Sequence, residues 1–203
     1  MAGILDTIDF NSYDDGDLHG QDSWATAYGA NADFQVQTSV VYEGAKAVSS
    51  VQKNGSGVVK TGTARTTGNQ GVYMRSTVTN DEIFFHLREP GNNDNSAIKL
   101  ASDGKIKARG AAWFDLKASY SANTWYWTEI EWKAGTTGSV RFRVDDETWS
   151  DWKNTARDSS TCNKVLCPYR TGTNGTSYWD YLSDSPYVAP VATRRRAAFM
   201  KFF

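Results

Sequence analysis

Two glutamates, Glu129 and Glu131, have a type and spacing that could serve acid–base chemistry. Residues two apart on a β-strand point to the same face, and two carboxylates on one face can hydrolyse a glycosidic bond as nucleophile and general acid. A second run of residues supplies Arg141 and Arg143 for the facing strand. These guanidinium groups would keep both carboxylates charged, whereas a general acid must hold a proton. We therefore expect the pair to be structural and the chain not to be an enzyme.

Carbohydrate binding is the second chemistry that the residue types allow. Sugars are held by an aromatic platform and by planar polar groups that fix their orientation. On this basis we predict carbohydrate-binding roles for Trp113, Trp127, Trp149 and Asn93. The alternative is that each tryptophan is a core or sheet-covering residue.

A calcium site is the third possibility, because the run D-D-G-D at residues 14–17 is rich in carboxylates. Calcium takes six to eight oxygen ligands. The candidate ligands are Asp9, Asp15, Asp17 and Asp180; the alternative is a solvated turn, and we predict no other cofactor.

The cysteines and the histidine of the strand I-F-F-H-L-R suggest no further chemistry. Cys162 and Cys167 cannot complete a zinc site without histidine, so we expect reduced, partly buried thiols, with a short-loop disulfide as the alternative. His86 has no serine, cysteine or aspartate pattern around it, which predicts a packed, hydrogen-bonded side chain.

These residues need strands to position them, and residues 123–147 predict a β-hairpin. Two alternating runs, rich in aromatic and β-branched residues, flank the turn A-G-T-T-G. One register gives an apolar face and a face of opposite charges, and a slip of one residue would ruin both. Its cross-strand pairs are Thr128–Val144, Ile130–Phe142 and Trp132–Val140 on one face, with Glu129–Arg143 and Glu131–Arg141 on the other. We expect this hairpin at the centre of a sheet.

The rest of the chain predicts more short strands. Turn signals recur about every eight to twelve residues, the spacing typical of a β-sandwich. The expected strands cover residues 4–10, 33–38, 42–51, 57–61, 97–100, 105–108 and 113–120, with a further hairpin formed by 71–79 and 82–88. With 203 residues, of which 13% are aromatic, the chain predicts a single antiparallel two-sheet β-sandwich over residues 1–187.

Charge and hydropathy exclude some partners and locations. The formal net charge of −1 gives no general attraction to nucleic acid, and no apolar run is long enough to span a bilayer. The N-terminus shows no basic region followed by an apolar run, so we expect synthesis in the cytoplasm without a signal peptide.

The C-terminal residues 188–203 differ from the rest in composition. They combine small residues with the cations Arg194, Arg195 and Arg196 and the aromatic residues Phe199, Phe202 and Phe203. An apolar end on a globular domain predicts docking to a groove or sheet edge of a neighbouring subunit. A frayed terminus is the alternative.

Several motifs together resemble concanavalin A-like (laminin-G-like) jelly-roll domains, including those of bacteriophage structural proteins. They are D-F-N-S-Y-D-D-G-D-L-H-G-Q-D-S-W at 9–24, E-G-A-K-A-V at 43–48, the hairpin at 123–147 and T-S-Y-W-D-Y-L at 176–182. The resemblance implies a jelly roll over roughly residues 4–187. Laminarinase-type glucanases of this fold carry E-x-D-x-x-E on one strand, and E-I-E-W-K here lacks the second and third acids.

The resemblance and the tail together predict a non-catalytic structural or attachment module. We expect a bacteriophage virion surface protein, a capsid decoration or fibre component, whose tail binds other virion subunits or copies of itself. A glycan-binding lectin that recognises a cell-surface glycan is the alternative, and a laminarinase-type glycosidase is the third hypothesis.

Overall fold

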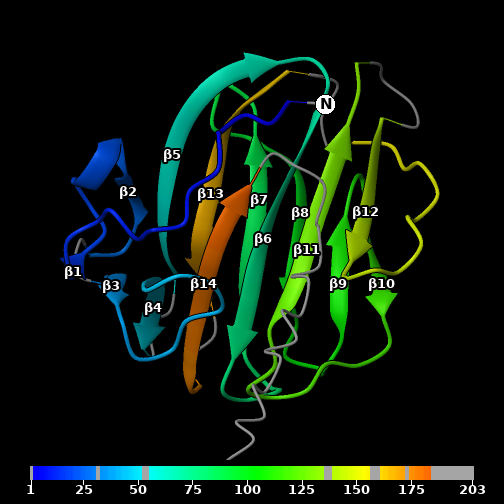
Figure 1. Cartoon of the computed structure of the whole chain (residues 1–203). Coiled ribbons are helices and arrows are strands. Elements are labelled where there is room, and N and C mark those ends of the chain that lie inside the picture. Colours follow the sequence, from blue (N-terminus) through cyan, green and yellow to red (C-terminus); the bar gives the residue numbers. More distant parts are fainter. Residues whose placement is uncertain are drawn as a thin grey trace, which may run out of the picture.

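Two antiparallel β-sheets packed face to face form the computed structural model of the chain (Figure 1). The structure describes residues 2–30, 33–51, 55–134, 139–155, 161–171 and 174–183. Sheet I has the strand order β1-β3-β4-β14-β6-β11-β12, and sheet II has the order β10-β9-β8-β7-β13-β5-β2. The predicted two-sheet β-sandwich is therefore confirmed. The predicted boundary at residue 187 and the tail at 188–203 lie outside the described residues.

The chain crosses between the two sheets repeatedly, and only some consecutive strands lie in the same sheet. Sheet I contains β1 (Gly16–Asp17), β3 (Gln35–Gln37), β4 (Ala47–Val51), β6 (Gly68–Ser76), β11 (Tyr126–Trp132), β12 (Val140–Val144) and β14 (Thr176–Ser183). Sheet II contains β2 (Ala25–Tyr28), β5 (Ser56–Arg65), β7 (Ile83–Arg88), β8 (Asp94–Leu100), β9 (Ile106–Arg109), β10 (Trp113–Lys117) and β13 (Cys162–Arg170). A short 3₁₀ helix covers Gln21–Ser23.

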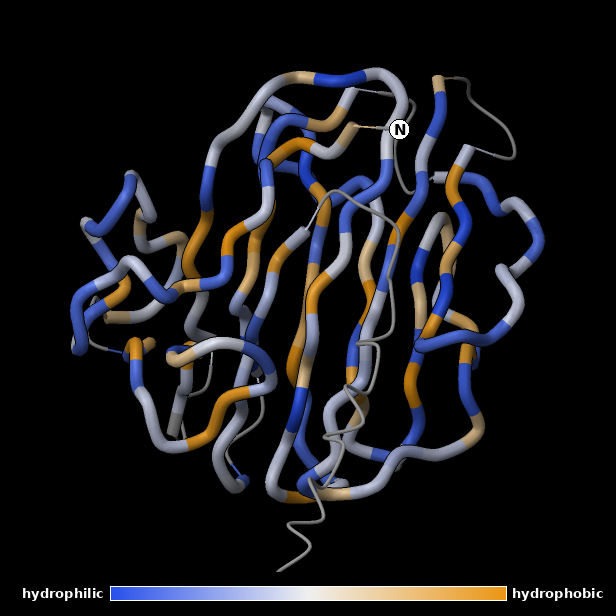
Figure 2. The backbone as a smooth tube through the Cα atoms, viewed as in Figure 1, coloured by the Kyte–Doolittle hydropathy of each residue, from blue (hydrophilic) through white to orange (hydrophobic). Residues whose placement is uncertain are grey.

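The core lies between the sheets, where the inward-facing residues of both meet. Figure 2 shows hydrophobic and hydrophilic residues alternating along many strands, as expected when one face is buried. Ile130 and Phe142 from sheet I and Phe85 and Ile98 from sheet II are fully buried in this core. Truncating such a residue to alanine costs about 2–5 kcal/mol, so the core dominates the stability of the domain.

The hairpin of β11 and β12 has the predicted register, but its place in the sheet was predicted wrongly. All five expected pairs form, from Thr128 with Val144 to Trp132 with Val140. The hairpin does not lie at the centre, because β12 is the last strand of sheet I. Residues 149–153 run along the outer edge of β12, where the amide of Ser150 donates to Phe142 at 2.9 Å and that of Lys153 to Val140 at 2.7 Å.

Two other predicted elements are wrong. Residues 71–79 and 82–88 do not pair as a hairpin, because β6 belongs to sheet I and β7 to sheet II. Residues 4–10 form only one bridge, between Ile8 and Leu182, and Phe10 has a positive φ of 59° that ends any extended run. The predicted pairing across Ser102-Asp-Gly is correct and joins β8 to β9.

A buried ion pair ties the two sheets together at one end. Arg170 of β13 binds the carboxylate of Asp81 at 2.8 Å, and both side chains are fully buried. The same guanidinium donates to the carbonyl oxygen of Ser50 in β4 at 3.0 Å, and Asp81 accepts a hydrogen bond from Ser177 of β14 at 2.9 Å. Removing one partner of such a pair costs about 3–5 kcal/mol, because the other charge is left buried alone.

Two remaining features concern the thiols and the membrane. Cys162 and Cys167 are free and fully buried in the core, deeper than the partial burial predicted. Burial raises the pKa of Cys162 to about 12, which makes its thiol unreactive. Among the residues that the structure describes, no helix has the length and apolar character needed to span a bilayer.

Candidate functional site

The outer face of sheet II gathers aromatic and charged side chains. In β7, Phe85 and Leu87 point into the core, so strand alternation places Phe84, His86 and Arg88 on the outer face. In β9 the same alternation buries Ile106 and Ala108 and turns Lys107 and Arg109 outward. Neighbouring strands therefore bring cations together on one face of the sandwich.

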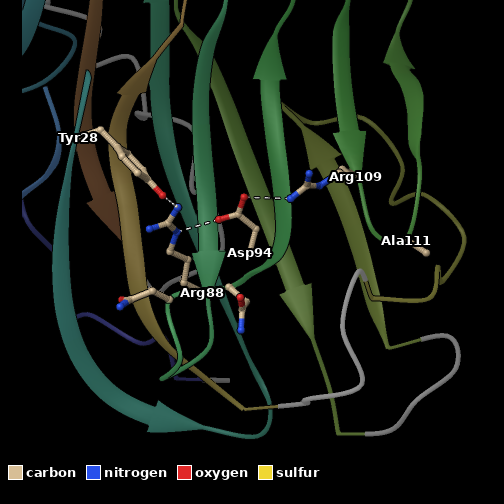
Figure 3. Close-up of a pocket in the computed structure, with 7 residues that line it drawn as sticks. Tyr28, Arg88, Asp94, Arg109 and Ala111 are labelled. Atoms are coloured by element: carbon tan, nitrogen blue, oxygen red, sulfur yellow. Dashed lines mark hydrogen bonds and ion pairs between the residues drawn. The ribbon is translucent and has the colours of Figure 1, made fainter. Parts of the chain in front are cut away.

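Two arginines on this face share one carboxylate (Figure 3). Nε of Arg88 lies 2.8 Å from Oδ1 of Asp94, and Nη2 of Arg109 lies 3.1 Å from Oδ2 of the same carboxylate. Nη2 of Arg88 also donates to Oη of Tyr28 at 2.8 Å. The group of Arg88, Asp94 and Arg109 thus carries a net positive charge of one at neutral pH.

The buried side chain of His86 contacts the carboxylate of Asp94. Its Nδ1 lies 3.2 Å from Oδ2 of Asp94. Burial lowers the pKa of His86, and the contact with Asp94 opposes this shift only in part. Burial raises the pKa of Asp94, but the hydrogen bond from His86 and the charge of Arg88 outweigh it, so this pKa lies well below its usual range. Asp94 therefore stays charged at neutral pH, while His86 stays neutral.

These charges face an open hollow of about 360 Å³. It is lined by Tyr28, Arg88, Asn92, Asn93, Asp94, Arg109 and Ala111. Tyr28 is 44% exposed; its ring lies 5.3 Å from the guanidinium carbon of Arg88, and its centroid lies 5.6 Å from that of the tilted ring of Tyr169. A planar, exposed ring beside a guanidinium group offers both a stacking surface and a charged hydrogen-bond donor.

A second hollow of about 340 Å³ adjoins the first at Ala111. It is lined by Ala111, Ala112, Trp113, Phe114, Lys153 and Asn154. Trp113 is 37% exposed, with Nζ of Lys99 at 4.8 Å and the guanidinium carbon of Arg109 at 5.4 Å from its ring. Because Trp113 lies over Arg109 while Phe114 packs on Phe142 of the core, this second hollow lies at the β10 edge of the sandwich, next to the cationic hollow.

The structure divides the four residues predicted to bind carbohydrate between the two sheets. Trp113 and Asn93 lie at the two hollows of sheet II, and Asn93 donates to Glu89 at 2.7 Å. Trp127 is only 1% exposed and lies in β11 of sheet I. Trp149 packs on the same sheet, 4.7 Å from the guanidinium carbon of Arg143. These four side chains do not form one surface.

The carboxylates of Glu129 and Glu131 are paired as predicted. Arg143 donates from Nε to Glu129 at 3.1 Å, and Arg141 donates from Nε to Glu131 at 2.7 Å. Glu129 is fully buried and also accepts hydrogen bonds from Asn69 at 2.8 Å and from the indole of Trp127 at 3.3 Å. This pair is therefore not an open catalytic pair of the laminarinase type.

The four aspartates predicted to bind calcium have separate partners. Asp9 accepts from the amide of Asn11, Asp15 pairs with Lys46, Asp17 accepts from Gln35, and Asp180 accepts from the amides of Tyr42 and Glu43. Among the described residues, no three histidine, cysteine or acidic side chains form a group that could hold a metal ion. Calcium binding stays a prediction, and the structure does not gather its proposed ligands.

The sequence reasoning missed the residues that line the cationic hollow, apart from Asn93. Tyr28, Arg88, Asp94 and Arg109 were not proposed, and His86 was correctly expected to be packed. Alternation in I-F-F-H-L-R and I-K-A-R is a signal that places cations on the outer face. The tail residues predicted to dock, Arg194–Arg196 and Phe199, Phe202 and Phe203, lie outside the described residues.

No protein-family model matches the sequence, and no curated protein matches it. Solved structures do match the fold. A glucuronan lyase from the fungus Trichoderma reesei superposes with a TM-score of 0.56 and 16% identity, covering 83% of this chain and 92% of its own. The fold is a concanavalin A-like jelly roll. The resemblance seen in the sequence motifs is thereby confirmed.

Two further structures share this jelly roll. A carbohydrate esterase of the Shiga toxin-encoding bacteriophage phi24B has a TM-score of 0.52 and 11% identity, covering 91% of this chain and 100% of its own. A sialidase has a TM-score of 0.64 and 11% identity over 87% of this chain. The chain spans only 18% of that sialidase, so it corresponds to one part of the larger protein.

These comparisons correct the expectation that the chain is not an enzyme. The three structures are named as a lyase, an esterase and a sialidase, and all three are enzymes. The expectation rested on the neutralised pair Glu129 and Glu131, whose pairing the structure does contain. The inference from that pair failed because an enzyme with this fold need not place its chemistry on those carboxylates.

Proposed function

We propose that the chain binds and acts on an acidic polysaccharide at the outer face of sheet II. The observation that carries this proposal is the carboxylate that Arg88 and Arg109 share, which leaves the 26% exposed Arg109 as a surplus cation at the open hollow that Tyr28 also lines. A guanidinium group can bind a carboxylate through two parallel hydrogen bonds. The excess positive charge of this group therefore favours a uronate over a neutral sugar.

The length of the face suits a polymer rather than a single sugar. Tyr28 lies in β2 at one edge of sheet II, and Trp113 lies in β10 at the other edge. The rings of Tyr169 and Phe84 link the two: ring centroids are 5.6 Å apart from Tyr28 to Tyr169, 5.1 Å from Tyr169 to Phe84 and 6.2 Å from Phe84 to Trp113. The two exposed rings therefore lie at most about 17 Å apart. Exposed rings at both ends and arginines between them offer stacking positions and charge contacts to several consecutive sugar rings. The likeness to a glucuronan lyase supports this proposal.

β-Elimination is the reaction that these groups support best. An arginine that binds the uronate carboxylate makes the neighbouring C5 proton more acidic, because it stabilises the negative charge that develops there. Oη of Tyr28, held by the hydrogen bond from Arg88 and reacting in its phenolate form, then accepts the C5 proton. The electron pair forms the C4–C5 double bond and the C4–O4 bond breaks. The departing O4 takes the proton back from Tyr28, which returns Tyr28 to the phenolate.

Affinity electrophoresis and ultraviolet absorbance test the two parts of this proposal. The full chain is run through gels that contain polyglucuronate, alginate or a neutral β-glucan, and the same polymers are assayed for absorbance of the new double bond. We expect retardation and absorbance with the acidic polymers alone. Equal retardation by the neutral glucan would contradict the charge argument, and retardation without absorbance would contradict the elimination.

Three variants locate the site. Arg109→Gln should weaken binding of the acidic polymer about tenfold or more, since a charged hydrogen bond contributes about 1.5–3 kcal/mol. Tyr28→Phe should abolish the absorbance change and leave retardation largely intact. Arg75→Gln is the matched control, because Arg75 lies on sheet I, where it donates to Asn123 at 2.9 Å. Weaker binding in this control would place the site elsewhere.

A virion surface location is a second proposal, which the likeness to a bacteriophage carbohydrate esterase favours. Under this proposal the tail, residues 188–203, joins the domain to other virion subunits or to copies of itself, and the face of sheet II meets a cell-surface glycan. Deleting residues 189–203 should abolish self-association in light scattering and leave gel retardation unchanged. Unchanged association after the deletion would contradict this role of the tail.

A further inference from the structure

The aromatic hollow beside the arginines has a chemistry that a plain uronate does not use. It is lined by the apolar residues Ala111, Ala112, Trp113 and Phe114 and by Lys153 and Asn154. Nζ of Lys153 lies 5.3 Å from the ring centroid of Phe114. Hydroxyl groups of a sugar would lose hydration against these apolar walls without finding enough partners, whereas a small apolar group would gain.

The floor of this hollow is held firmly in place. The amide of Ala111 donates to the carbonyl oxygen of Asn154 at 2.7 Å. A Cβ at the preceding Gly110 would lie 2.1 Å from that same oxygen, so the backbone segments approach as closely as glycine allows. Phe114 packs edge-on against Phe142 of the core, with ring centroids 5.6 Å apart. The hollow is therefore preformed.

The two hollows are arranged as parts of one site. Both hollows are lined by Ala111, and the guanidinium carbon of Arg109 lies 5.4 Å from the ring centroid of Trp113. The cation and the apolar surface are therefore close enough for one sugar residue and its substituent to contact both. Trp113 and Tyr28 are the only large hydrophobic side chains counted as exposed among the described residues, and both lie on this face. Their exposure fits a surface that a ligand covers.

We infer that the ligand is an acidic polysaccharide that carries acetyl substituents, with a carboxylate bound at Arg109 and an acetyl group held in the hollow at the β10 edge, beside Trp113. The acetyl methyl group contacts Trp113 and Ala112, and Nζ of Lys153 donates to the acetyl carbonyl oxygen. This inference rests on the proposed function, because it names the substrate class of the same site.

A matched pair of polymers tests the inference. Naturally O-acetylated alginate is compared with the same sample after mild alkaline deacetylation, which leaves chain length and carboxylates unchanged. Burying one methyl group contributes about 0.8 kcal/mol, so we expect the acetylated polymer to bind about fourfold more tightly or better. Hyaluronan, whose acetyl groups are amides, forms a third arm. Tight binding of hyaluronan would assign the hollow to N-acetyl groups, and preference for acetylated alginate alone would assign it to esters.

A variant that fills the hollow completes the test. Ala112→Leu should remove the preference for the acetylated polymer and leave binding of the deacetylated polymer unchanged. Ala118→Leu is the matched control, an exposed alanine just beyond the other end of β10, and should keep the preference. Equal binding of both alginates by the native chain would overturn the inference and leave the proposed function standing. Binding of neither polymer would overturn both.

Discussion

The outer faces of the two sheets use the same residue types to opposite effect. On sheet I, Glu129 and Glu131 each face their own arginine across the β11–β12 ladder, and Glu129 is fully buried. On sheet II, Arg88 and Arg109 share Asp94, whose side chain is 25% exposed at an open hollow. The charges on sheet I are neutralised in pairs, whereas the group on sheet II keeps one excess positive charge.

This difference separates a structural use of charge from a binding use. A buried, paired carboxylate is already satisfied and has nothing left to offer a ligand, so its removal acts on stability. Arg109 shares its carboxylate with Arg88 and is 26% exposed, so it retains unused hydrogen-bonding capacity and its removal acts on binding, whereas Arg88 is only 7% exposed. The ratio of cations to anions, and not the number of charged residues, distinguishes the two faces.

The largest expected effect comes from the paired face. Glu129→Gln should lower the free energy of unfolding by about 3–5 kcal/mol, because it leaves the guanidinium of Arg143 without its counterion. Glu131→Gln should cost about 1 kcal/mol, since Arg141 is 30% exposed and water can replace the lost partner. Urea denaturation measures both. Equal losses would show that burial does not decide the strength of these pairs.

Asp180 sharpens the comparison, because it is a buried carboxyl on sheet I that backbone amides satisfy instead of a cation. Burial raises its pKa from 3.8 to about 6 despite these amides. A raised folded-state pKa stabilises the fold below pH 4, and this contribution, about 3 kcal/mol at most, is lost as the pH rises to about 6. An NMR titration of ¹³C-labelled aspartate carboxyls should show one group near this value, absent in Asp180→Asn. An ordinary value for every aspartate would contradict the assignment.

Asp94 should behave in the opposite sense. Its folded-state pKa lies well below the usual range, so its contribution is present above about pH 4 and is lost as the pH falls further. Asp94→Asn should lower stability at neutral pH by about 1–3 kcal/mol and flatten the acid limb of the stability profile. The same variant removes the sole anion between the arginines and should tighten binding of an acidic polymer. Weaker binding would mean that Asp94 serves mainly to hold the arginines in place.

The smallest expected effect concerns geometry at constant charge. Arg109→Lys keeps the cation and loses the planar fork, so affinity for an acidic polymer should fall about two- to fivefold, or less than 1 kcal/mol. Raising the NaCl concentration should weaken binding in both proteins, because exposed charge contacts are screened. Salt-independent binding would contradict a role for the charge surplus.

The sequence was sufficient for the hairpin register and insufficient for sheet membership. The register followed from Glu129, Arg143 and their neighbours, because both faces of the hairpin demand the same pairing. The turn at Asn80-Asp81 looks like a hairpin turn but joins β6 of sheet I to β7 of sheet II. The local sequence of a turn is the same whether it joins two paired strands or two strands of different sheets. The pairing with strands far away in the chain decides which of the two forms.

The site was harder to predict for the same reason. Alternation alone places Arg88 and Arg109 on outward faces, and this signal was available in the sequence. The contribution of Tyr28 was not, since it depends on β2 lying at the edge of sheet II beside β5. Trp127 was chosen because it shares a face with Glu129, yet that face proved to be buried. Outward alternation does not reveal which outer face other side chains cover.

The segment 149–153 has a consequence for how copies of this protein can meet. Its hydrogen bonds to Phe142 and Val140 occupy the backbone groups that β12 would otherwise offer to a visiting strand. Trp149 and Trp152 stack on Arg141, which adds bulk along that margin. A second copy therefore cannot extend sheet I by adding a strand at β12, and any contact made by strand addition has to use a different sheet edge.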